Sequence, residues 1–114
     1  MRKTPTVLVV AALVTGCGSR MHEVPDVTKP NTIVLTKKPS QGFIHSFSAS
    51  GSGEINGTAE ISLILNGGPY KTETLSGSVA FQWGGDWYSD KAEIQYNPSS
   101  VTGGNLRLKC KFND

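Results

Sequence analysis

Residues 56–65, Asn-Gly-Thr-Ala-Glu-Ile-Ser-Leu-Ile-Leu, decide the class of fold. They begin with Asn56-Gly57, a dipeptide that favours a two-residue type I′ turn because both central residues of that turn need a positive φ. Every second residue after the dipeptide is apolar or small, namely Ala59, Ile61, Leu63 and Leu65. This alternation is typical of a β-strand with one buried face. We therefore predict a hairpin whose turn is Asn56-Gly57 and whose second strand covers residues 58–65.

The stretch before the dipeptide supplies the first strand of this predicted hairpin. Residues 43–50 (FIHSFSAS) place apolar side chains on one face and mostly serines on the other. A two-residue turn would pair Leu63 with Ser50 and set apolar residues opposite serines, because directly opposed residues share a face. A slip of one residue restores the apolar face, and glycine accommodates the bulge that such a slip needs. We therefore predict a bulge or a break in pairing at residues 51–53 (Gly-Ser-Gly).

Further alternating stretches flank this region on both sides. Leu106, Leu108, Cys110 and Phe112 alternate with polar residues, which predicts a half-buried last strand that points the Cys110 thiol into the core. We also expect strands over residues 32–37, 70–83 and 87–96, a turn over residues 66–69, a tight connection at Gly84-Gly85-Asp86 and a longer loop over residues 97–105.

This pattern predicts an all-β domain over residues 32–114. Six to seven short strands separated by turn residues are typical of a small antiparallel sandwich or a partly open barrel. Parallel strands need long crossover connections, and the short segments between the predicted strands leave no room for them.

The first residues of the chain form a secretory signal. Arg2 and Lys3 precede a short apolar run at residues 7–14 (VLVVAALV), and Thr15-Gly16-Cys17 follows it. A charged start, an apolar stretch of this length and small residues at a cleavage site are the parts of a signal peptide. A membrane-spanning helix would need roughly 20 apolar residues.

Val14-Thr15-Gly16-Cys17 resembles the lipobox of bacterial lipoproteins. The resemblance implies that residues 1–16 are cleaved off as a signal peptide and that the sulfur of Cys17 carries the lipid, with acyl chains such as palmitate. Two or three acyl chains hold a protein stably on a membrane. Gly18 stands where such lipoproteins carry Asp for retention at the inner membrane, which favours the outer membrane over the inner membrane or a Gram-positive cell membrane.

Residues 17–31 carry the lipid site and then polar residues with two prolines and no periodicity. Segments of this composition behave as flexible linkers. We therefore expect residues 17–31 to form a tether between the membrane and the β domain.

Charge and cysteine content narrow the classes of function. The intact chain has 11 Lys and Arg and 9 Asp and Glu, and removal of Arg2 and Lys3 with the signal leaves 9 of each sign. A chain of zero net charge lacks the basic surface that nucleic-acid binding requires, so we expect no nucleic-acid partner. Lipidation of Cys17 leaves Cys110 without a disulfide partner, and its strand position predicts a buried free thiol.

The segment Trp83-Gly84-Gly85-Asp86-Trp87-Tyr88 is the candidate binding site. Strand phase places Trp83 in the core and Trp87 on the polar face, with Tyr88 on the inner face. An exposed Trp beside a turn suits the contact with a protein partner or a sugar ring.

We find no combination of residues that predicts catalysis, and we expect no metal or cofactor. There is no Gly-x-Ser-x-Gly motif for a serine nucleophile, and the His and Cys side chains are too few for a zinc site. The sequence therefore predicts a non-catalytic protein-interaction module of the cell envelope, with a glycan-binding domain as the alternative. Ser50-Gly51-Ser52-Gly53 also resembles, over these few residues, the Ser-Gly motif of membrane-bound lysozyme inhibitors, which are small β-barrel lipoproteins.

Overall fold

The computed structural model describes residues 19–114, and it consists of antiparallel strands without a helix over that range. The predicted signal peptide (residues 1–16) and Cys17 lie outside the described residues. The strands, in chain order, are β1 (Ser19–Glu23), β2 (Asn31–Thr36), β3 (Ser46–Leu65), β4 (Gly68–Asp86), β5 (Lys91–Pro98) and β6 (Gly103–Asn113). The predicted all-β antiparallel fold of six to seven strands is confirmed.

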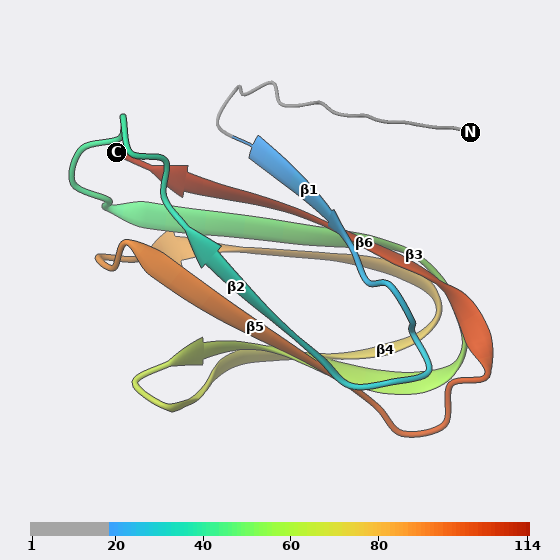
Figure 1. The fold of residues 1–114 in the computed structure, drawn as a ribbon. Coiled ribbons are helices and arrows are strands. Elements are labelled where there is room, and N and C mark those ends of the chain that lie inside the picture. Colours follow the sequence, from blue (N-terminus) through green and yellow to red (C-terminus); the bar gives the residue numbers. More distant parts are fainter. Residues whose placement is uncertain (1–18) are drawn as a thin grey trace, which may run out of the picture.

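β3 and β4 form one long hairpin that folds over on itself (Figure 1). β4 pairs along one edge of β3, while β6 and then β5 pair along the other edge. The first layer contains β1, β6 and the first half of β3, and the second layer contains β2, β5 and the second half of β3. The two layers are thus parts of a single sheet curled into a half-barrel, with the core between them.

The predicted hairpin turn at Asn56-Gly57 is wrong. Both residues lie inside β3, which runs through them as a strand of 20 residues. The two-residue turn is instead the second Asn-Gly pair of the chain, Asn66-Gly67, where φ is 54° at Asn66 and 81° at Gly67. These positive angles are the ones that a type I′ turn requires, so the predicted turn is confirmed at Asn66-Gly67, whereas Gly68 and Pro69 already belong to β4.

The predicted bulge at residues 51–53 is also wrong. β3 pairs without interruption through these residues, with β4 on one side and with β6 on the other. The pairing of β3 with β4 shifts instead between Ile55 and Thr58, so that Asn56 and Gly57 are two extra residues on β3. Extra residues on one strand increase its bend and twist, and this is the place where the sheet turns from the first layer into the second.

The bend in β3 is held by the connection between β5 and β6. The amides of Ser99 and Ser100 both donate to the carbonyl of Thr58, at 2.9 and 3.1 Å, and the Thr102 amide donates to the carbonyl of Asn56 at 2.9 Å. Gly57 has φ of 126°, and a Cβ on it would overlap the carbonyl oxygen of Ser100. Only glycine combines this backbone angle with so close an approach of two chains.

The inner face of β3 keeps one parity on both sides of the bend. Two extra residues preserve the alternation, so odd-numbered residues point inward before the bend and after it. In β6, the buried residues are those that the sequence predicts, and they include Cys110. The buried side chains of β3 are Phe47, Ala49, Ile55, Ala59, Ile61 and Leu63.

The predicted tether is wrong from Ser19 onward. Residues 19–23 form β1, which pairs with β6, and Val24 and Val27 in the following connection are buried in the core. The carbonyl of Val27 accepts a hydrogen bond of 2.7 Å from the hydroxyl of Tyr96, which is itself fully buried. The five residues of β1 are too few to show an alternating pattern within a polar segment that contains prolines. Their conformation is determined by pairing with β6.

We predict that Gly57→Ala lowers the free energy of unfolding by about 3 kcal/mol, because the new methyl group adds a strained φ to an overlap with backbone. The matched control is Gly84→Ala, since Gly84 lies in β4 with no heavy atom within 4 Å of the added Cβ and with no positive φ. The control should stay within about 0.5 kcal/mol of the unmodified protein. Urea unfolding of the three proteins measures both values, and equal midpoints for all three would contradict the role assigned to Gly57.

Candidate functional site

Both tryptophans of the predicted binding segment belong to the core. Trp83 lies in β4 and is 6% exposed, which confirms its predicted core position, whereas Trp87 follows β4 and is only 4% exposed. The ring of Trp87 packs against Phe47 with centroids 5.7 Å apart, and its indole N–H donates to the carbonyl of Lys91 at 3.0 Å. A buried indole with a satisfied N–H is a structural element of the core.

The predicted exposure of Trp87 and Tyr88 is therefore reversed in the structure. Tyr88, expected to face inward, is 77% exposed, and Trp87, expected to face solvent, is buried. The prediction extended the alternation of β5 back to Trp87, but β5 begins at Lys91. The Trp87 amide donates to the carbonyl of His45 at 3.2 Å. The segment before β5 is therefore held by the loop that contains His45, and its side chains do not alternate as they would in a strand.

The Gly84-Gly85-Asp86 segment is not the tight connection that the sequence predicts. It forms the last part of β4 and pairs with residues 46–48 of β3. The side chain of Asp86 is exposed at this end of the strand. Asp90, the other acid near the tryptophans, forms an ion pair of 3.5 Å with Lys37.

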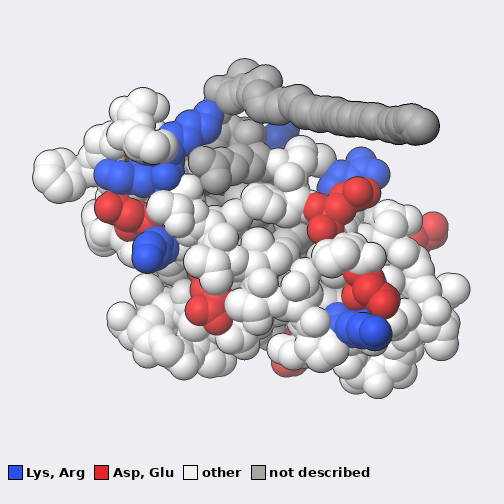
Figure 2. Space-filling model, viewed as in Figure 1, with Lys and Arg blue, Asp and Glu red and all other residues white. Residues whose placement is uncertain are grey.

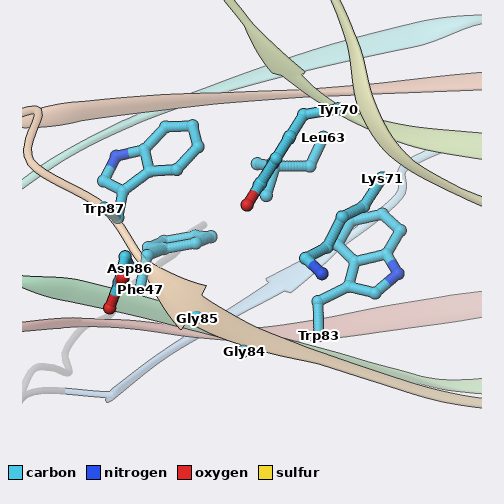
Figure 3. Close-up of a pocket in the computed structure, with 9 residues that line it drawn as sticks. All are labelled: Phe47, Leu63, Tyr70, Lys71, Trp83, Gly84, Gly85, Asp86 and Trp87. Atoms are coloured by element: carbon cyan, nitrogen blue, oxygen red, sulfur yellow. The ribbon is translucent and has the colours of Figure 1, made fainter.

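A small cleft lies between the two tryptophans (Figure 3). Its walls are aromatic and aliphatic, and Tyr70 stands over it with its ring 6.4 Å from that of Trp87. The ammonium group of Lys71 lies 5.3 Å from the centroid of the Tyr70 ring, which is a cation–π distance. The cleft has room for about one water molecule. It is lined by Phe47, Leu63, Tyr70, Lys71, Trp83, Gly84, Gly85, Asp86 and Trp87.

A larger groove opens beside the tip of the β3–β4 hairpin. The pairing of β3 with β5 ends at Ile64 and Glu93, while β3 runs on to Leu65 and β5 starts at Lys91, so the two strands separate here. The resulting groove measures about 320 Å³. Its lining consists of Val34, Ile64, Leu65, Asn66, Gly67, Trp87, Ser89, Lys91, Ala92 and Glu93.

The groove is lined by apolar, polar and charged side chains. Val34 of β2 is 63% exposed and Leu65 is 38% exposed, although both are aliphatic. Val34 pairs with Glu93, so the two side chains share the outer face of the second layer. The sequence does carry a signal for this surface, because Ile33-Val34-Leu35 are three consecutive apolar residues and a strand with one face on the core buries only every second one.

Cys110 is buried in the core, as its strand phase predicts. It lies opposite Ala49 of β3, and burial raises the pKa of the Cys110 thiol to about 12. A thiol with so high a pKa stays protonated at neutral pH and is a poor nucleophile.

Residues 19–114 contain neither a candidate metal centre nor a candidate membrane-spanning helix. In this range no group of three or more His, Cys, Asp or Glu side chains is arranged to hold a metal ion. Over the same residues there is no helix whose length and apolar character would let it cross a membrane.

We predict that Trp87→Ala and Tyr88→Ala differ sharply in stability. Loss of the buried indole should lower the free energy of unfolding by about 3–5 kcal/mol, because it leaves a cavity against Phe47. Loss of the exposed phenol should change it by less than about 0.5 kcal/mol. Thermal or urea unfolding of both variants measures the difference. A larger loss of stability for Tyr88→Ala than for Trp87→Ala would contradict the burial of Trp87 and the exposure of Tyr88.

In comparisons with models of protein families, with curated proteins and with solved structures, no match to the chain was found.

Proposed function

We propose that the chain is the precursor of a lipoprotein of the bacterial outer membrane whose small β domain binds another envelope protein without catalysis. The membrane anchor is the lipid on Cys17, and its support is the sequence: a signal peptide ends in Val14-Thr15-Gly16, directly before that cysteine. The partner-binding surface is the groove beside the hairpin tip. The exposure of Val34 and Leu65 across this groove is the observation that carries the proposal.

The chemistry of the groove favours a protein segment as its occupant. Its lining combines the aliphatic side chains of Val34, Ile64 and Leu65 with the charged side chains of Lys91 and Glu93. Protein interfaces likewise combine apolar contacts with polar groups. β2 pairs only with β5 in the described sheet, so its other edge offers backbone N–H and C=O groups beside Val34. An extended segment of a partner can add to such an edge and place a side chain in the groove.

Glycan binding is the second candidate, and the larger groove would suit it better than the cleft between the tryptophans. The cleft between Trp83 and Trp87 has room for about one water molecule, which is too small for a sugar ring. Of the candidate residues, Trp87 also lines the larger groove, so a sugar would have to bind there beside Val34. Tyr88 and Asp86 do not line that groove.

The lipid anchor is tested on the full chain expressed in a Gram-negative host with radiolabelled palmitate. We expect label on the mature protein and its recovery with outer-membrane fractions after density-gradient separation. Cys17→Ser should remove the label and leave an unprocessed precursor, because that side chain is the acyl acceptor and defines the cleavage site. An unlabelled wild-type protein would contradict the proposed anchor.

The groove is tested by placing a photo-crosslinking amino acid at Val34 or at Leu65 in the same cells. We expect a protein adduct at both positions, because both side chains stand in the contact. The matched control is Thr32, which lies on the same outer face of β2, two residues from Val34 and outside the groove.

Three results discriminate between the candidates. A protease-sensitive adduct at position 34 and none at position 32 supports a protein partner. An adduct that muramidase removes and protease does not supports the glycan alternative. An adduct at Thr32 in the absence of any at Val34 and Leu65 would overturn the groove as the binding surface.

A further inference from the structure

The described chain begins at one end of the half-barrel. Ser19, the first residue of β1, pairs with Lys111, which lies two residues before the end of β6 at Asn113. The same end carries the connections from β2 to β3 (residues 37–45) and from β4 to β5 (residues 87–90), together with the C-terminus (Figure 1). We call residues 37–45 and 87–90 the loop end.

The loop end exposes two aromatic side chains. Phe43 is 96% exposed, the largest exposure among the large apolar residues of the described chain, and Tyr88 is 77% exposed. The opposite end includes the bend in β3 and the connections over residues 24–30 and 99–102, and none of the large exposed apolar residues lies there. The molecule is therefore asymmetric along its strands, with the exposed aromatic rings at the end where the described chain begins.

These aromatic side chains stand on loops that are fixed to the sheet. The Lys37 amide donates to the Asp90 carbonyl at 2.8 Å, and the Lys37 ammonium group reaches the Asp90 carboxylate at 3.5 Å and the Gly42 carbonyl at 3.0 Å. The two loops are thereby joined to each other. The Gly42 amide donates to the carboxylate of Asp114 at 2.8 Å, and this bond lowers the pKa of that carboxyl group.

The short length of chain between Cys17 and Ser19 then places the loop end relative to the proposed lipid. Cys17 is two residues before Ser19, and two residues of fully extended chain span about 7 Å. When the first strand begins so close to the acyl chains, the linker is too short for the domain to move away from the bilayer or to reverse its orientation on it. The end that carries Ser19 must then lie against the headgroups.

We propose that the loop end is a membrane-contacting surface, in which Phe43 and Tyr88 insert into the interfacial region of the phospholipid bilayer that holds the lipid anchor. This inference rests on the proposed lipidation of Cys17. Aromatic side chains with an apolar ring, and for Tyr88 a polar tip, are suited to the boundary between acyl chains and headgroups.

Charge does not explain this contact. Acidic and basic side chains both occur on the visible face (Figure 2), and the loop end contains Lys37, Lys38 and Asp90, of which Lys37 and Asp90 form an ion pair. The chain without Arg2 and Lys3 has 9 basic and 9 acidic residues. The contact is therefore made by aromatic insertion, so it should persist on zwitterionic lipid and at high salt, where attraction between charges is screened.

The test uses the full-length lipidated protein, purified and reconstituted into phosphatidylcholine vesicles. Phe43→Cys and Tyr88→Cys each receive an environment-sensitive thiol label. Ser78→Cys provides the matched control, since Ser78 is exposed and pairs with Glu54, beside the bend in β3. Cys110 needs no replacement because its thiol is buried, and the unmodified protein should take up no label.

We expect the label at positions 43 and 88 to shift its emission to the blue and to be quenched by lipids with brominated acyl chains. The label at position 78 should show neither effect, and raising the salt concentration should change none of the three results. Quenching at position 78, or its absence at both 43 and 88, overturns the proposed orientation. Quenching that disappears at high salt would show an electrostatic contact and overturn aromatic insertion.

The palmitate experiment separates this inference from the anchor on which it rests. If Cys17 carries no palmitate, the proposed anchor is wrong and the inference falls with it. If Cys17 is acylated and positions 43 and 88 remain unquenched, the anchor stands and the membrane-contacting loop end is wrong. A blue shift at position 43 in whole envelopes but not in vesicles identifies a protein as the occupant and also overturns it.

Discussion

The close approach of Gly57 in β3 to the backbone of Ser100 is the contact on which the rest of the fold depends. Here β3 exchanges one neighbour, β6, for another, β5, and the sheet turns from one layer into the other. The amides of Ser99, Ser100 and Thr102 hold the bend by donating to carbonyls of β3 on either side of Gly57. Without this bend the inner face of a 20-residue strand would have no second layer to bury it.

The class of fold follows from the sequence, but the path of the chain does not. Asn56-Gly57 and Asn66-Gly67 are the same turn dipeptide, and only the second makes a turn because the first is enclosed by the connection over residues 99–102. One sequence signal does favour a continuous strand: apolar residues keep odd numbers from Phe47 to Leu63, whereas a two-residue turn at 56–57 pairs odd with even positions. The mismatch from which a bulge at residues 51–53 is predicted, with apolar residues opposite serines, results from this odd-numbered pattern.

The candidate site shows the same limit at the scale of single side chains. Alternation places Trp83 correctly because it lies inside β4, and it fails for Trp87 and Tyr88 because they precede β5. Val34 stands out in the sequence as the middle of three apolar residues, but its place in a groove depends on where β3 and β5 separate. β1 could not be predicted locally, because its conformation is determined by β6, at the other end of the chain.

That pairing of the first strand with the last also sets the order in which the molecule can be completed. A ribosome, or any export channel that passes the chain from its N-terminus, releases residues 19–23 long before residues 103–113. Until the last strand emerges, Val24 and Val27 have no finished core to enter, although the local β3–β4 hairpin can already form. Completion of the sheet is therefore coupled to delivery of the final residues, and a chain truncated within β6 leaves both its first strand and one edge of β3 unpaired.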